Sequence, residues 1–114
     1  MKAVVILNPG IESSLALIET PRPTPQSGEV LIRVRAAGVN RGDLLQRQGR
    51  YPPPPGAPPF PGLEVAGEVV ALGNGTQGLN VGDRVCALLS GGGYAEYVTT
   101  PATLCFKTPP TLSD

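Results

Sequence analysis

A chain of 114 residues has room for one domain with a real hydrophobic core, and we expect no second domain within it. Nine Lys and Arg balance nine Asp and Glu, so no overall field favours nucleic acid or an anionic membrane as a partner. The absence of histidine excludes a Ser-His-Asp or Cys-His catalytic arrangement within the chain. Any general acid or base must be a carboxylate, a Tyr or a Lys.

The two cysteines, Cys86 and Cys105, lack the CxxC spacing that is typical of zinc sites. The apolar run at residues 3–7 is too short for the core of a secretion signal, and no run is long enough to predict a membrane span. We therefore expect free thiols and a cytoplasmic location.

Alternating and β-branched runs predict three strands in the first half of the chain, at residues 2–7, 15–19 and 29–39. Three prolines at positions 21, 23 and 25 then exclude both a helix and a central strand from the intervening segment. That segment should lie extended on the surface.

The period changes over residues 41–48, where Leu44 and Leu45 stand among polar residues before Gly49. This pattern predicts a helix of about two turns, which is marginal alone and should depend on packing of the two leucines. Prolines dominate residues 51–61, which predicts a stiff, polyproline-like crossing.

The second half predicts short strands at residues 63–72, 84–89, 94–99 and 104–107. Short strands at this spacing favour a small barrel or sandwich. The final Ser113-Asp114 is typical of a helix start, so we expect a fragment that is cut where a second domain begins.

Two glycine-rich stretches resemble nucleotide-binding loops only superficially. Residues 73–78 match GxGxxG, but the residues after them predict another turn instead of the helix that binds pyrophosphate. Residues 90–93 lack the GK[ST] ending of a phosphate loop, which favours a sharp turn. We interpret both stretches as loops between strands.

The polar residues around the predicted helix leave several functions open. Asp43 and Glu64 could act as paired acid and base, although structural carboxylates are commoner. Tyr51 could pack on the prolines or turn its hydroxyl to a cleft. The helix also has three neighbouring arginines, Arg41, Arg47 and Arg50. They could bind a phosphate or simply form a solvated helix face, and the sequence favours neither interpretation.

Several motifs together narrow these alternatives: AAGVNRGDLLQRQGRYPPPP, FPGLEVAGEVVALG, VGDRV, GGGYAEYV and the PPTLSD ending. Their combination resembles the zinc-independent quinone oxidoreductase (zeta-crystallin-like) branch of the medium-chain dehydrogenase/reductase superfamily. The resemblance implies that residues 1–114 form the GroES-like domain, a mainly β, partly open barrel with short helices, and lack the Rossmann cofactor domain. A two-domain enzyme would be its complete form.

The resemblance also assigns metal-ligand positions. In zinc-dependent relatives the position of Asn40 is a metal-ligating Cys and that of Leu63 a metal-ligating His, followed by a Glu that this chain keeps as Glu64. The replacements imply no catalytic metal, and the four-cysteine lobe for structural zinc has no counterpart either.

The cofactor and substrate positions follow from the same resemblance. Asn40, Arg41, Gly42 and Asp43 match the stretch that touches the nicotinamide end of NADPH, and Tyr51 matches a tyrosine that lines the quinone cleft. Asn40 and Tyr51 are therefore the expected catalytic hydrogen-bond donors to the acceptor oxygen.

We accordingly expect the substrate-side domain of an NADPH-dependent quinone oxidoreductase, inactive without its cofactor domain and able to form a homodimer when complete. Its partner would be a quinone or another small carbonyl acceptor, with no nucleic acid and no membrane. Two alternatives stay open. One is an enoyl reductase of the same superfamily, and the other is a free-standing GroES-like module that binds a protein or serves as a structural unit.

Overall fold

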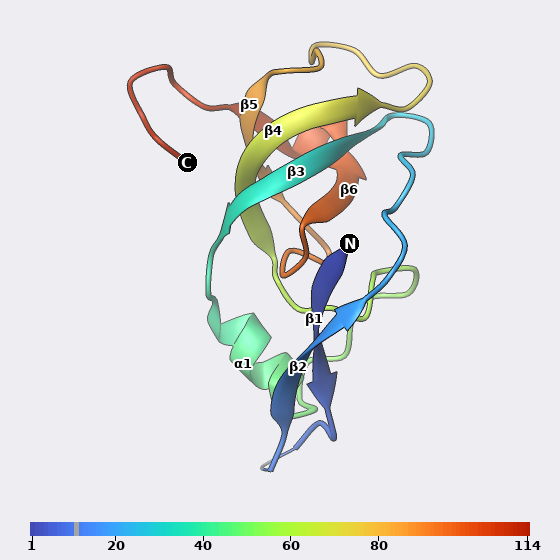
Figure 1. Cartoon of the computed structure of the whole chain (residues 1–114), viewed down its shortest axis with the longest axis vertical. Helices are drawn as coiled ribbons and strands as arrows, with labels where there is room; N and C mark the ends of the chain where they lie inside the picture. The colour runs from blue at the N-terminus through green and yellow to red at the C-terminus, as the bar shows by residue number, and fades with distance from the viewer. Residues whose placement is uncertain (11) are drawn as a thin grey trace.

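The structure is a computed structural model that describes residues 1–10 and 12–114 (Figure 1). The expected mainly β class is confirmed, and the two sheets form no closed barrel in the described residues. In chain order the elements are β1 (Lys2–Leu7), β2 (Ser14–Glu19), β3 (Glu29–Ala37), α1 (Arg41–Arg47), β4 (Glu64–Leu72), β5 (Arg84–Leu88), β6 (Tyr97–Pro101), a 3-10 turn η1 (Ala102–Leu104) and β7 (Cys105–Lys107).

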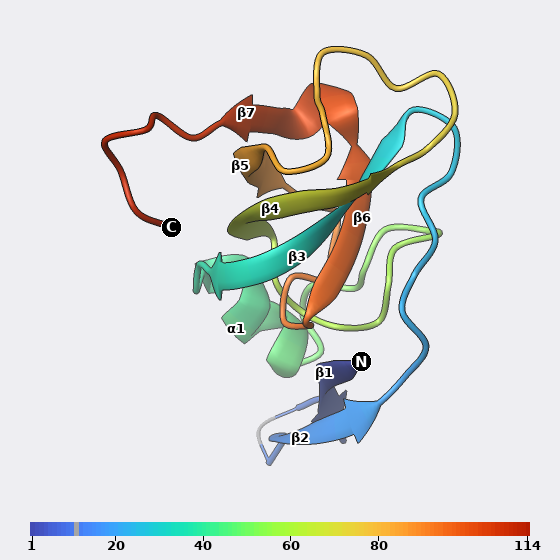
Figure 2. The same ribbon diagram turned by 45° about the horizontal axis from the view of Figure 1, so that its top comes forward.

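The larger sheet is antiparallel with the strand order β6-β3-β4-β5-β7, and β1 and β2 form a separate hairpin beside α1 (Figure 2). The hairpin is joined to the rest of the chain through the segment before β6. There Ala3 bridges Ala95, and the Val4 N–H donates to the Tyr94 carbonyl at 2.8 Å. The β1–β2 hairpin is thus anchored next to the residues that precede β6.

The core lies on one face of the larger sheet and consists mainly of valines. Val30 and Ile32 from β3, Val69 from β4 and Val85 from β5 are fully buried, and Val98 from β6 is nearly so. β-branched side chains pack well on a pleated surface, and their alternation with polar residues places them on one face. The alternation in the sequence therefore predicted this part of the fold.

The strand expected at residues 94–99 is wrong at both ends, since β6 covers Tyr97–Pro101. Tyr94 lies outside the ladder with β3 because its backbone is bonded elsewhere. Its N–H donates to the Pro61 carbonyl at 2.9 Å, and its carbonyl accepts from Val4. Sequence alternation did not reveal these distant partners.

The expectation that Leu44 and Leu45 hold α1 in place is wrong for Leu44, whereas Leu45 is half-buried. Leu44 is 49% exposed, whereas the polar residues Asp43 and Gln46 are buried. Gln46 Nε2 donates to the Pro59 carbonyl at 3.4 Å, so a hydrogen bond joins the helix to the proline-rich crossing. Buried polar groups with partners replace the apolar contacts that periodicity predicted.

The two glycine-rich stretches differ in the structure. Residues 73–78 form an open loop between β4 and β5, as expected. Gly91, Gly92 and Gly93 lie between β5 and β6, as expected, and are buried against the proline-rich crossing. The Gly92 N–H donates to the Phe60 carbonyl at 2.8 Å and the Gly93 N–H to the Gly62 carbonyl at 3.1 Å. The glycines allow two backbones to approach closely.

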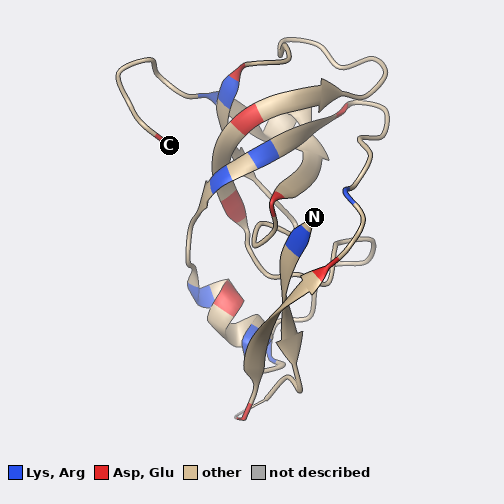
Figure 3. Ribbon diagram, viewed as in Figure 1, with Lys and Arg blue, Asp and Glu red and all other residues tan. Residues whose placement is uncertain are grey.

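Acidic and basic side chains are interspersed over the sheet, the hairpin and the helix (Figure 3), which agrees with the balanced net charge. Among the described residues, no helix has the length and apolar character needed to cross a bilayer.

Candidate functional site

The candidate site begins at Asn40, the residue that joins the end of β3 to the start of α1. Asn40 has an extended backbone, with φ −119° and ψ 160°, and its N–H donates to Asp43 Oδ2 at 2.9 Å. Its side-chain Nδ2 donates to Glu64 Oε2 at 3.3 Å. The Asn40 backbone is thus held by a residue of α1, and its half-buried carboxamide by the first residue of β4.

Asp43 is the centre of this hydrogen-bond network. Its side chain is only 5% exposed, and its Oδ2 accepts from the Asn40 N–H and from the Tyr94 hydroxyl, the latter at 3.0 Å. Its Oδ1 accepts from the Gly62 N–H at 2.8 Å. Three donors satisfy the buried carboxylate and join α1 to the loop before β4 and the segment before β6.

Tyr94 is a functional candidate that sequence reasoning missed. Burial, together with the hydrogen bond from its hydroxyl to Asp43 and the negative charge there, raises the pKa of Tyr94 to about 12. The phenol is therefore protonated and a donor at neutral pH. The GGGYAEYV motif contained the residue but gave no sign of a partner 51 positions away.

Two glycines leave room for the side chains opposite them. A Cβ atom at Gly38 would lie 2.7 Å from the Glu64 Cγ, and one at Gly42 would lie 2.8 Å from the Leu63 Cδ1. Leu63 is half-buried and contacts the start of α1. Larger residues at the two glycine positions would displace Glu64 and Leu63, so both glycines help define the local geometry.

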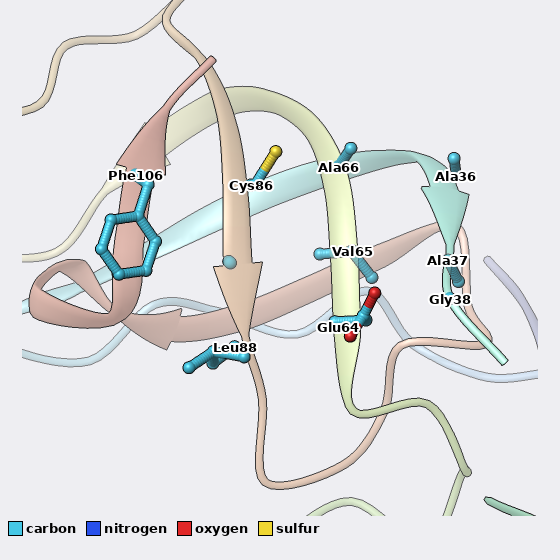
Figure 4. Close-up of a pocket in the computed structure, with 10 residues that line it drawn as sticks. Ala36, Ala37, Gly38, Glu64, Val65, Ala66, Cys86, Leu88 and Phe106 are labelled. Atoms are coloured by element: carbon cyan, nitrogen blue, oxygen red, sulfur yellow. The ribbon is translucent and has the colours of Figure 1, made fainter. Parts of the chain in front are cut away.

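A shallow apolar hollow of about 420 Å³ begins beside Glu64 and crosses β3, β4, β5 and β7 (Figure 4). Gly38 and Glu64 line one part of it, and Leu88 and Phe106 line the other. Leu88 is 52% exposed and Phe106 63% exposed, so both side chains are accessible. A flat apolar molecule lying here would have a polar end within reach of the Asn40 and Glu64 pair.

The remaining predicted site residues lie outside the Asp43 network. Arg41 is exposed and forms no ion pair with any described residue. Tyr51 is 36% exposed on the loop after α1, and its hydroxyl has no hydrogen-bond partner in residues 1–10 and 12–114. The structure therefore joins Asn40, Asp43 and Glu64 by hydrogen bonds, and Arg41 and Tyr51 take no part in these bonds.

The three arginines around α1 do not surround one point. Arg47 donates from Nε to Ser13 Oγ at 3.0 Å and from Nη2 to the Ser13 carbonyl at 2.9 Å. Arg47 and Arg50 line a second hollow, of about 550 Å³, whereas Arg41 does not. Arg47 thus helps hold the β1–β2 turn against the helix.

The thiols show no sign of a bridge or a metal centre. Cys86 and Cys105 are both free, and burial raises the pKa of the Cys105 thiol. In the part of the chain that the structure describes, no three His, Cys, Asp or Glu side chains cluster in a way that could hold a metal ion.

The strand order and the motifs around Asn40 have a clear counterpart in known proteins. Residues 26–110 match the family model "Alcohol dehydrogenase GroES-like domain". The chain belongs to this family. The expected GroES-like fold and the expected place within the medium-chain dehydrogenase/reductase superfamily are therefore confirmed.

Several relatives of this GroES-like domain are informative. The human "Synaptic vesicle membrane protein VAT-1 homolog-like" is 42% identical over 113 residues, which are 99% of this chain and 27% of the relative. The rat "Quinone oxidoreductase" is 41% identical over 91 residues, which are 79% of this chain and 28% of the relative. This chain therefore spans little more than a quarter of these relatives.

Solved structures of oxidoreductases also match this chain over only part of their length. The Escherichia coli quinone oxidoreductase complexed with NADPH matches with a TM-score of 0.86 and 29% identity, over 99% of this chain and 35% of that one. The CurK enoyl reductase matches with a TM-score of 0.84 and 28% identity, over 98% of this chain and 36% of that one. Oxidoreductases with different acceptors thus share this domain.

Proposed function

We propose that this GroES-like domain forms the substrate side of an NADPH-dependent quinone oxidoreductase. The observation that carries the proposal is the hydrogen bond from the Asn40 carboxamide to Glu64, a residue that lines the apolar hollow. The rat and Escherichia coli quinone oxidoreductases among the relatives support the same reaction class.

The chemical role of Asn40 follows from its free hydrogen-bonding capacity. An amide Nδ2 carries two N–H groups, and one of them is used by Glu64, so the second can donate to an acceptor carbonyl. As hydride arrives, negative charge develops on that oxygen, and a preorganised donor stabilises it by roughly 3 kcal/mol. The Tyr51 hydroxyl, which has no partner in the described residues, is proposed as the second donor.

Some residues at the start of α1 can contact the nicotinamide end of NADPH, whereas others can only support them. The exposed guanidinium of Arg41 offers donors to its phosphates, and the Asn40 Oδ1 offers an acceptor to its amide. The Asp43 carboxylate is buried and accepts three hydrogen bonds. We therefore propose that it supports Asn40 from within the domain and does not contact the cofactor. When bound, NADPH supplies the hydride.

Replacement of Asn40 tests this role in the complete protein that carries the domain. Asn40→Ala should lower kcat with a quinone by about a hundredfold, the factor for loss of one oxyanion donor, with little change in thermal stability. Oxidation of NADPH, followed by its absorbance, gives the rate. Asn74→Ala, in the exposed loop after β4, is the matched control. An unchanged kcat in Asn40→Ala would remove Asn40 from the chemistry.

Tyr51 is tested in the same assay. Tyr51→Phe removes only the hydroxyl of an exposed ring, so the unfolding midpoint should stay constant while quinone turnover falls. Turnover equal to that of the unaltered protein would leave Tyr51 as a packing residue.

An enoyl reductase is the second candidate, and the likeness to the CurK enoyl reductase favours it. Reduction of an enoyl thioester also develops negative charge on a carbonyl oxygen, so Asn40 would serve both reactions. The ratio of kcat/KM for quinones to that for enoyl thioesters decides between them.

A binding module without catalysis is a third candidate from a different class. In the proposed enzyme, most of the cofactor site lies in a separate domain, so the 114-residue chain alone should bind NADPH weakly. Calorimetric titration of this chain with NADPH measures that affinity. Sub-micromolar binding to this chain alone would contradict that division. We keep a cytoplasmic setting as part of the proposal.

A further inference from the structure

The feature that the proposed chemistry does not use directly is the hydrogen bond between Tyr94 and Asp43. Asp43 Oδ2 accepts at 2.9 Å from the Asn40 N–H and at 3.0 Å from the Tyr94 hydroxyl. The same oxygen atom therefore joins the backbone of the proposed catalytic residue to a phenol from another segment of the chain.

The Tyr94 backbone is fixed independently of its side chain. Its N–H donates to the Pro61 carbonyl at 2.9 Å, and its carbonyl accepts from the Val4 N–H at 2.8 Å. Next to it, Gly93 approaches Gly62 so closely that a Cβ on Gly62 would lie 2.6 Å from the Gly93 Cα. The phenol is thus mounted on backbone that is bonded to both β1 and the proline-rich crossing.

The phenol has two acceptors within reach and one proton to donate. The Gly38 carbonyl lies 3.4 Å from its oxygen, whereas Asp43 Oδ2 lies at 3.0 Å and carries charge, so the carboxylate is the better acceptor. The raised pKa of Tyr94, about 12, keeps the proton in place at neutral pH. The Tyr94 hydroxyl therefore remains a hydrogen-bond donor over the pH range in which enzymes usually work.

We propose that Tyr94 is a positioning residue, whose hydroxyl holds the Asp43 carboxylate in the orientation that fixes the Asn40 backbone and so aims the Asn40 carboxamide. The inference deepens the proposed function and rests on it for the role of Asn40. Without the hydroxyl, Asp43 keeps only its two backbone donors and gains freedom to turn. Asn40 then loses its fixed geometry, although no group that contacts the substrate has been removed.

The first test needs no activity and uses hydrogen exchange in Tyr94→Phe, which keeps the ring. The Asn40 amide should exchange roughly tenfold faster than in the unaltered chain, the factor for weakening one hydrogen bond to a charged group. The amide of Val69, in the fully buried part of β4, should accelerate much less. Tyr97→Phe is the control, because the Tyr97 ring lies under the Arg22 guanidinium and makes no contact in this network. Equal acceleration of both amides in Tyr94→Phe would overturn the inference.

The second test is a double-mutant cycle on kcat in the complete protein. Tyr94→Phe should lower kcat about tenfold with the KM for NADPH nearly unchanged, and should have no further effect in an Asn40→Ala background. The same loss in both backgrounds would show that Tyr94 does not act through Asn40 and would overturn the positioning role. If the unaltered protein reduces neither quinones nor enoyl thioesters, the proposed function fails, and the exchange measurement alone decides whether Tyr94 fixes Asn40.

Discussion

The five-stranded sheet and the region around α1 are stabilised by different interactions. In the sheet, β-branched side chains such as Ile32, Val69 and Val85 fill a core from which water is excluded. Within α1, the buried side chains are Asp43 and Gln46, and hydrogen bonds hold them. The difference shows that one small domain uses apolar packing to make its scaffold and a buried polar network to place its candidate site.

A cavity in the sheet core should have the largest effect on stability. Ile32 is 0% exposed in the central strand β3, so Ile32→Ala should lower the free energy of unfolding by about 4 kcal/mol. Urea unfolding followed by circular dichroism measures this. Leu17→Ala, at a side chain that is 70% exposed, is the control and should change little. Similar losses in both variants would contradict the assignment of the core.

Removal of the carboxylate at the centre of the polar network should lower the free energy of unfolding slightly less than Ile32→Ala does. Asp43→Ala leaves the N–H groups of Asn40 and Gly62 and the Tyr94 hydroxyl without their acceptor, at a cost of about 3 kcal/mol. The same unfolding measurement applies. Asp83→Ala, at a half-buried carboxylate near Lys107, is a control for loss of an acidic residue. A loss no greater than that of the control would mean that the network contributes little to stability.

The backbone at Gly62 lies close to that of Gly93 beside the network, which predicts that replacing Gly62 lowers stability more than replacing an open glycine. Gly62 has φ +107°, and a Cβ there would lie 2.6 Å from backbone atoms of Gly93 and Tyr94. Gly75 has φ +73° with no atom within 4 Å of a Cβ. Gly62→Ala should therefore destabilise the chain by about 2 kcal/mol more than Gly75→Ala, which carries only the backbone strain. Equal melting temperatures would contradict the close approach.

The smallest effect is a dependence of stability on alkaline pH. The folded pKa of Tyr94, about 12, lies above its ordinary value of 10.0, so the neutral phenol stabilises the fold fully below pH 10. This stabilisation is lost as the pH rises from 10 to 12. Because the ring is partly exposed, we expect a loss of roughly 1 kcal/mol, less than the shift alone would give.

Tyr94→Phe removes this dependence and supplies the measurement. The difference in the free energy of unfolding between the unaltered chain and Tyr94→Phe should shrink between pH 10 and pH 12. A difference that stays constant with pH would contradict the raised pKa.

Local residue patterns predicted most of the scaffold. Alternation in β3 and β4 predicted the strands and their buried face, because side chains two residues apart share one side of a strand. Turn residues marked the loop at 73–78, and the motifs around Asn40 identified the GroES-like domain. These features depend on neighbours in the sequence or on a shared pattern of residues.

The way the candidate site is held depends on contacts between segments that are far apart in the chain. Leu44 proved exposed and Asp43 buried, although helix periodicity favoured the opposite. The partners of Asp43 at Gly62 and Tyr94 lie 19 and 51 positions away in the chain. Periodicity reports which side of a local element meets apolar surroundings. It contains no information about a distant donor that makes burial of a carboxylate favourable, and such donors exist only once the segments have packed together.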